Sequence, residues 1–245
     1  MNRHSKNIIQ LSKTDRKLGI LVDPDKHSEH DFAAFISDIL ALKPDYILIG
    51  SSIIVKSSVE KAAQQIKSTT DIPLILFPGH FNQLNNFVDG VLLLSLISGR
   101  NPDLLIGQHV LAAPILAKID AEILSTGYML IDGGKSTSVS YISNTLPIPQ
   151  DKNDIAICTA MAGQFIGMKY IYLDAGSGAI NSVPFSMVSS VADSIDLPLI
   201  VGGGIKDMKT IERYWESGAN LVVIGNALER NTLSTNSDFE KQTQI

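Results

Sequence analysis

The chain has 245 residues, a formal net charge of −5 at pH 7 and 44% hydrophobic residues. An acidic chain without a long basic run is unsuited to nucleic acid as a main partner, and its apolar content excludes general disorder. Because Cys158 is the only cysteine, no internal disulfide is possible, and a cytoplasmic location is expected. Residues 1–17 lack the apolar core of a signal peptide, and no apolar run reaches the roughly 20 residues that span a bilayer. The sequence therefore predicts no membrane span, and it leaves peripheral membrane contact open.

Short apolar runs typical of strands alternate with stretches of helical periodicity. We expect strands over residues 18–22, 46–49, 73–77, 90–94, within 123–131 with an interruption at Gly127, and over 170–173, 199–201 and 221–224. We expect helices over residues 30–42, 55–68, 103–117, 152–167, 184–194 and 207–217. Two segments depart from this rhythm: residues 78–88 are too short and polar for a helix, and residues 132–150 form a long polar excursion.

Eight strands separated by helices in about 240 residues are typical of a (β/α)8 TIM barrel. A doubly wound sheet is the alternative, but no single G-x-G-x-x-G motif opens the chain. We therefore expect one barrel domain over residues 1–245, irregular at the third helix. Residues 1–17 would be an N-terminal extension, and residues 231–245 a polar tail or a last helix.

Glycine-rich loops follow the last three expected strands, within residues 174–179, 202–205 and 225–227. Glycine lets backbone N–H groups approach a ligand closely, and a helix that starts after such a loop favours an anion. In a barrel the carboxyl ends of all strands meet on one face, so these loops predict a phosphate-binding cup there.

Acidic and hydroxyl side chains follow the first two strands: Asp23 and Asp25, then Ser51 and Ser52. A carboxylate beside a substrate phosphate is a typical environment for Mg²⁺. The expected mouth is therefore acidic on one side and glycine-rich on the other, which suggests two phosphorylated reactants.

Several motifs, in order between residue 18 and about residue 230, carry a family resemblance. They are Leu21-Val22-Asp23-Pro24-Asp25-Lys26, Gly50-Ser51-Ser52, Tyr141-Ile142-Ser143-Asn144-Thr145, Tyr172-Leu173-Asp174-Ala175-Gly176-Ser177-Gly178, Val201-Gly202-Gly203-Gly204-Ile205 and Gly225-Asn226. Together they resemble geranylgeranylglyceryl phosphate synthase and its bacterial relatives. The turn Ser98-Gly99-Arg100-Asn101-Pro102 is similar to that of the longer archaeal-type branch, which also occurs in bacteria.

The resemblance implies a prenyltransferase that joins a polyprenyl diphosphate, with geranylgeranyl diphosphate expected, to sn-glycerol 1-phosphate as an ether. By matching motifs, the metal Mg²⁺ would be held at Asp23 and Ser52, and Asp174 would orient and deprotonate the attacking hydroxyl. The glycerol phosphate would be bound by Tyr172, Leu173, Asp174, Ala175, Gly176, Ser177, Gly178, Gly203, Gly204, Gly225 and Asn226. Exposed helices of such barrels often pair, so a homo-oligomer is expected, with a dimer and a hexamer both open.

One position departs from the family pattern, because a glutamate is expected where this chain has Asp174. The missing methylene withdraws the carboxylate by about one carbon–carbon bond, and a misplacement of that size costs roughly 10²-fold in rate. Either the loop compensates, or the acid mainly orients glycerol. The second reading fits a reaction in which diphosphate departure creates an allylic cation that needs little activation of its nucleophile.

Other residues have two readings each. Arg100 clamps the diphosphate or pairs with an acid on a helix, and Lys135 contacts the diphosphate or lies in a mobile loop. A prenyl groove is expected from Leu92, Leu93, Leu94, Leu96, Ile97, Leu104, Leu105, Val110, Leu111 and Ile115, and the small residues Ala112, Ala113 and Pro114 are expected to leave room for the chain. The helix over residues 152–167 is apolar on nearly every side, so we expect it, with Cys158, to be deeply packed.

Two other functions remain open. The first is another phosphate-binding barrel, such as a sugar-phosphate isomerase or a cyclase, in which Asp23 and Asp132 would form an acid–base pair. The Asp174-Ala175-Gly176-Ser177-Gly178 loop does not fit that chemistry. The second is a non-catalytic barrel that binds prenyl or phosphate groups, which only the aspartate at position 174 favours.

Overall fold

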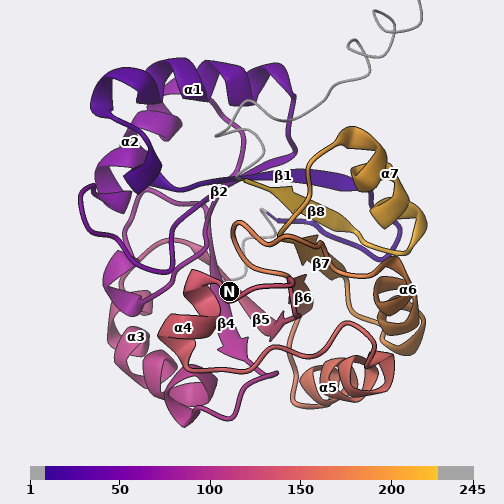
Figure 1. The fold of residues 1–245 in the computed structure, drawn as a ribbon. Helices are drawn as coiled ribbons and strands as arrows, with labels where there is room; N and C mark the ends of the chain where they lie inside the picture. Colours follow the sequence, from indigo (N-terminus) through magenta and orange to yellow (C-terminus); the bar gives the residue numbers. More distant parts are fainter. Residues whose placement is uncertain (1–8, 226–245) are drawn as a thin grey trace, which may run out of the picture.

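The computed structural model describes residues 9–225, in which parallel strands close into a barrel in sequence order (Figure 1). The strands are β1 (Lys17–Val22), β2 (Tyr46–Ile49), β3 (Leu74–Leu76), β4 (Gly90–Leu96), β5 (Glu122–Leu130), β6 (Tyr170–Asp174), β7 (Leu199–Gly202) and β8 (Leu221–Ile224). The ring closes between β1 and β8, where Gly19 lies opposite Val223. The (β/α)8 barrel is confirmed, and the doubly wound alternative is wrong.

The helices of the described chain are mostly arranged around this barrel. They are α1 (Glu29–Ala41), α2 (Val59–Thr69), α3 (Gln108–Leu116), α4 (Ser138–Ser143), α5 (Asn153–Phe165), α6 (Phe185–Ser194) and α7 (Met208–Glu216). In Figure 1, α4 lies inside the ring that the other helices form. Among residues 9–225, none of these helices has the length and apolar character needed to cross a membrane.

Three segments differ from ideal (β/α)8 geometry or from the expected boundaries. Between β3 and β4 the chain forms only the short 3₁₀ helix η2 (Phe81–Gln83), so the predicted irregularity at the third helix is confirmed. The predicted interruption at Gly127 is wrong, because β5 pairs with β4 through this residue. Helix α2 begins later than expected, since Ser58 caps it by accepting a hydrogen bond from Lys61 N.

Alternate residues of each strand belong to two apolar clusters. In β2, Tyr46 and Leu48 belong to the cluster that fills the barrel, whereas Ile47 and Ile49 pack in the larger cluster with the helices. Side chains of successive strand residues point to opposite faces, which explains this division. The barrel interior is therefore a packed core, and a cavity can open only at one of its ends.

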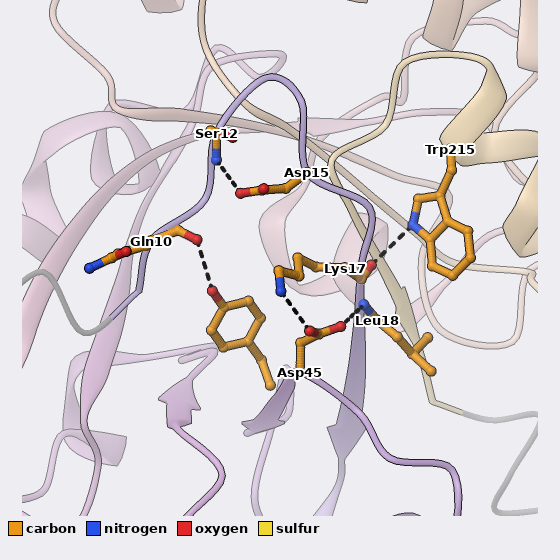
Figure 2. A network of polar contacts seen from close by, with 8 residues as sticks. Gln10, Ser12, Asp15, Lys17, Leu18, Asp45 and Trp215 are labelled. Carbon is orange, nitrogen blue, oxygen red and sulfur yellow. Dashed lines mark hydrogen bonds and ion pairs between the residues drawn. The ribbon is translucent and has the colours of Figure 1, made fainter.

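Residues 9–16 cover the end of the barrel where the strands begin. The Tyr46 hydroxyl donates a hydrogen bond to Gln10 O at 3.1 Å, and Trp215 Nε1 donates to Lys17 O at 3.1 Å. The first contact joins the N-terminal segment to β2, and Figure 2 shows the second joining α7 to the first residue of β1. The segment expected as an extension is thus, in its described part, a cover over this end of the barrel.

Helix α5 packs differently from the expectation. Its small residues Ala156, Ala160 and Gly163 are buried, whereas Phe165 is 74% exposed and Cys158 is exposed. A Cβ atom added at Gly163 would lie 2.8 Å from a side-chain atom of Ile171, so only a small residue permits this approach to β6. The predictions of a deeply packed helix and a buried cysteine are wrong, because α5 packs on the barrel through its small residues, and Phe165 and Cys158 remain exposed.

Candidate active site

A cavity of about 640 Å³ opens at the carboxyl ends of the strands. Its wall brings together most of the site residues expected from the sequence: Asp23, Ser52, Tyr172, Asp174, Ser177, Gly178, Gly203, Gly204 and Gly225. Leu173 and Ala175 are buried outside this lining, with exposures of 0% and 1%. Asn226 lies outside the described residues.

The glycine-rich side of the cavity requires glycine at defined positions. Gly203 and Gly204 have φ angles of +83° and +70°, which other residues adopt only with strain. A Cβ atom at Gly203 would lie 2.5 Å from Asp174 Oδ1 and 2.6 Å from Gly176 N. The loops after β6 and β7 are therefore pressed together at the place where the sequence predicts a phosphate-binding cup.

Asp174 is buried at the end of β6 and is fixed through both of its oxygens. Gly176 N donates to Oδ1 at 2.7 Å, and the Tyr128 hydroxyl donates to Oδ2 at 2.7 Å. Burial raises the pKa of Asp174, and these two hydrogen bonds oppose the rise. The Gly176 N–H is thus occupied by the carboxylate, although the sequence predicted it as a ligand to glycerol phosphate.

Tyr128 is a site residue that the sequence analysis missed. It lies within β5, two residues before the strand ends, and is only 5% exposed. Its ring packs edge-on against Tyr172, which stacks on Phe77, and all three rings line the cavity. The only signal in the sequence was that the alternation of β5 points the Tyr128 side chain into the barrel. Many core residues share this direction, so it did not single out Tyr128.

The acidic side of the cavity holds Asp23, whose side chain is 16% exposed. Its Oδ2 accepts a hydrogen bond from Ser51 Oγ at 3.1 Å and lies 3.7 Å from Lys26 Nζ, and Ser52 also lines the cavity. No cluster of three or more His, Cys, Asp or Glu residues suited to a metal occurs between residues 9 and 225. One carboxylate with neighbouring hydroxyl oxygens fits Mg²⁺, which takes few protein ligands and completes its shell with water and substrate phosphate.

The carboxylate of Asp25 binds the loop between β2 and α2. Its carboxylate accepts hydrogen bonds from the N–H groups of Val55, Lys56 and Ser57 at 2.6, 3.1 and 2.8 Å, and from Ser57 Oγ at 2.5 Å. Desolvation raises the pKa of Asp25, but the hydrogen bonds from the Ser57 hydroxyl and the three N–H groups outweigh it and lower the pKa to about 2. Asp25 thus holds the loop that carries Ser52.

A large part of the remaining wall of the cavity is apolar. Part of the predicted prenyl groove lines it, namely Leu92, Leu93, Leu94, Leu96, Leu104 and Ala112. The other predicted groove residues do not line it, and Val110 and Leu111 are exposed instead. A polar cup and an apolar wall therefore share one cavity.

The basic residues at the mouth are distributed differently from the expectation. Arg100 is exposed and donates to Gly99 O at 2.7 Å, and it does not line the cavity. Lys135 lines the cavity, as does Lys206, which the sequence analysis did not single out. Lys206 was missed because in the sequence it is an ordinary loop lysine after the triple glycine. Only the fold shows that it lines the cavity.

Comparison with known proteins gives relatives along most of the chain. The chain is 49% identical over 225 residues, 92% of this chain and 89% of the relative, to the geranylgeranylglyceryl phosphate synthase of Chitinophaga pinensis. It is 34% identical over 209 residues, 85% of each chain, to the geranylgeranylglyceryl phosphate synthase of Methanosphaera stadtmanae. These similarities agree with the resemblance that the motifs carry.

A solved structure is similar as well. The (S)-3-O-geranylgeranylglyceryl phosphate synthase of Thermoplasma acidophilum, crystallised with its substrate sn-glycerol-1-phosphate, superposes with a TM-score of 0.83 at 28% identity. The match covers 89% of this chain and 88% of that chain. The model of the PcrB family matches residues 12–243, so this protein belongs to the PcrB family.

Proposed function

We propose that this protein joins geranylgeranyl diphosphate, or a polyprenyl diphosphate of similar length, to sn-glycerol 1-phosphate as an ether and releases diphosphate. One structural observation carries the proposal: a glycine-lined cup and an apolar wall share a single cavity. The family membership and the 49% identity to a geranylgeranylglyceryl phosphate synthase support the same reaction.

In this proposal, sn-glycerol 1-phosphate binds at the ends of β6, β7 and β8. Backbone N–H groups of Ser177, Gly178, Gly203, Gly204 and Gly225 hold its phosphate. The N–H of Gly176 is excluded from that set because it already donates to Asp174. Tyr172 lines the same cavity beside the cup and bounds the glycerol.

The diphosphate of the second substrate binds on the opposite side of the cavity, where Asp23 and Ser52 hold Mg²⁺. Bound Mg²⁺ would neutralise charge on the departing diphosphate. Lys26 and Lys135 line the cavity and supply positive charge to the same group. The prenyl chain extends along the apolar wall of β4 and α3, between Leu92 and Ala112.

The chemical step forms one bond and breaks one bond. A glycerol hydroxyl oxygen attacks the first carbon of the prenyl chain, the bond from that carbon to diphosphate breaks, and the hydroxyl proton passes to Asp174. The raised pKa of the Asp174 carboxyl suits it to accept a proton. Tyr128 keeps the carboxylate in position through its hydrogen bond to Oδ2.

The experiment that tests this function mixes the protein with radiolabelled sn-glycerol 1-phosphate, Mg²⁺ and prenyl diphosphates of increasing length. We expect an ether product whose yield peaks at one chain length and which is not formed from sn-glycerol 3-phosphate. An absence of ether product at every length overturns the proposal. Light scattering on the same preparation tests the homo-oligomer that the sequence analysis expects, with the masses of a dimer and a hexamer easily separated.

A further inference from the structure

Exposed apolar side chains gather on the connections that leave the carboxyl ends of the strands. Leu146 is 90% exposed, Tyr141 80% and Val55 73%. The whole set, here called the apolar rim, consists of Ile53, Val55, Ile106, Tyr141, Ile142, Leu146 and Ile180. All strand-to-helix connections of a parallel barrel emerge on one face, so these side chains surround the cavity mouth.

Hydrogen bonds tie neighbouring connections to one another in two groups, the first connection with the second, and the fourth with the fifth, sixth and seventh. The bonds between neighbouring connections are Val55 N to Asp25 Oδ2, Asn101 Nδ2 to Ser143 O, Ile180 N to Gly133 O and Lys206 Nζ to Ile180 O. Ile142 and Ile180 also line the cavity. The rim therefore borders the mouth directly.

The same connections carry an excess of exposed positive charge. Lys26, Lys56, Arg100, Lys135 and Lys206 are exposed there. Within the described strand-to-helix connections the exposed acids are Asp103 and Asp151, whereas Asp23, Asp25, Asp132 and Asp207 are half-buried. Asp151 lies 3.7 Å from the Lys152 ammonium, and Asp23 lies 3.7 Å from the Lys26 ammonium. This local excess contrasts with the net charge of −5 of the whole chain.

We propose that this face docks on a lipid bilayer that contains anionic headgroups. The apolar rim enters the headgroup layer, and Lys56, Arg100 and Lys206 lie against lipid phosphates, which attract basic residues near the membrane surface. Burial of the apolar side chains adds a hydrophobic contribution to binding. The binding depends on several side chains together, because one inserted group is too weak to hold a protein on a membrane.

The arrangement favours a bilayer over a protein partner. The rim residues stand on separate connections around an open cavity, with lysines between them, and a rigid protein covering all of them would seal the mouth. A fluid lipid surface adapts to apolar side chains that are separated by lysines, and small molecules can still reach the mouth of the cavity. A bilayer is also the phase in which a long apolar substrate dissolves. Membrane docking therefore extends the proposed function, but it does not depend on that function.

The test is co-sedimentation with vesicles of phosphatidylcholine containing 30% phosphatidylglycerol, compared with vesicles of phosphatidylcholine alone, in the absence of substrates. We expect the protein to bind the anionic vesicles at least fivefold more strongly and to lose binding as salt is raised. The double variant Val55→Ser/Leu146→Ser should bind at least tenfold more weakly. Neither side chain lines the cavity, so its turnover of detergent-dispersed substrate should be unchanged.

Phe165→Ser is the matched control, because Phe165 is 74% exposed but lies at the end of α5. It should bind vesicles as the unaltered protein does. An equal loss in the control, or no vesicle binding at low salt, overturns the proposal. A vesicle-independent drop in oligomer mass caused by Leu146→Ser also overturns it, since the rim would then contact a second copy of the chain. Because substrates are omitted, a failure of this test is distinct from a failure to form the ether.

Discussion

The Tyr128 hydroxyl lies 2.7 Å from Asp174 Oδ2 and donates a hydrogen bond to it inside the barrel, where both residues are buried. The bond joins the middle of β5 to the end of β6, and it fixes a carboxylate that is one methylene shorter than the glutamate expected for the family. With both of its oxygens accepting hydrogen bonds, the Asp174 carboxylate is held in one position.

Replacement of Tyr128 by phenylalanine tests this relationship. The lost hydrogen bond no longer opposes the effect of burial, so the pKa of Asp174 should rise further. The acid limb of the kcat/KM profile should move to higher pH, and the rate at neutral pH should fall roughly tenfold or more, since a hydrogen bond to a charged group is worth about 1.5–3 kcal/mol.

Tyr170→Phe is the control for that variant, because the Tyr170 hydroxyl contacts Ile9 O at the closed end of the barrel. Its pH profile should match that of the unaltered protein. An unchanged profile in Tyr128→Phe would remove the role assigned to the tyrosine.

Replacement of Asp174 by asparagine should abolish proton acceptance while it keeps the size of the side chain. An amide nitrogen would also face one of the two donors, Gly176 N–H or the Tyr128 hydroxyl. We expect kcat to fall by roughly 10²-fold or more, which is the usual contribution of an acid–base group. The acid limb of the pH profile should disappear. Full turnover by this variant would exclude a chemical role for Asp174 and leave it with a structural role only.

Replacement of Gly203 by alanine should damage the phosphate cup. The new methyl group would meet Asp174 Oδ1 at 2.5 Å, and the residue would have to keep a φ angle of +83°. We expect the KM for sn-glycerol 1-phosphate to rise more than tenfold and the free energy of unfolding to fall by about 1–3 kcal/mol.

Gly167→Ala separates the effect of the positive φ angle from the effect of the clash with Asp174. Gly167 has a φ angle of +88°, but no atom lies within 4 Å of an added Cβ. This control should lose stability while its KM stays unchanged. A similar KM increase in both variants would contradict the proposed cup.

Replacement of Asp25 by asparagine should loosen the loop that carries Ser52. The pKa of Asp25 is lowered to about 2 in the folded protein, whereas an unfolded aspartate titrates near 3.9. A carboxyl with a lowered pKa stabilises the fold fully above the unfolded value and loses that effect as pH falls toward the folded value. The stability difference between the two proteins should therefore be constant above about pH 4 and shrink between about pH 4 and 2.

Urea unfolding at a series of pH values measures this difference. Asp71→Asn is the control, since Asp71 is an exposed residue on the turn before β3. A pH-independent difference for Asp25→Asn would show that the carboxylate does not act through its charge. The requirement for Mg²⁺ in the ether-forming assay should rise in Asp25→Asn and stay the same in the control.

The features that follow from local patterns were predicted from the sequence. Apolar runs followed by glycine located the strand ends, and the closure rule of a barrel then brought Asp23, Asp174 and Gly203 to one mouth. Turn glycines with positive φ are readable because few other residues tolerate that conformation.

The features that depend on which face of an element packs were not predicted. Tyr128 has the same register as ordinary core residues. Helix α5 is apolar on nearly every side, so its periodicity could not indicate that the face with Ala156 and Ala160 would be buried. For Arg100, its position in a family-like turn suggested a ligand contact, and its side chain donates a hydrogen bond to Gly99 O outside the cavity lining.

The cover formed by residues 9–16 also constrains the order of events in turnover. Within residues 9–225 that end of the barrel is closed and the interior is filled, so both reactants must arrive, and both products must leave, on the side where the strands end. A long lipid product that lingers there delays the next glycerol phosphate, so we expect slow product departure, rather than bond formation, to limit the steady-state rate. A burst of ether in the first turnover would be its kinetic signature.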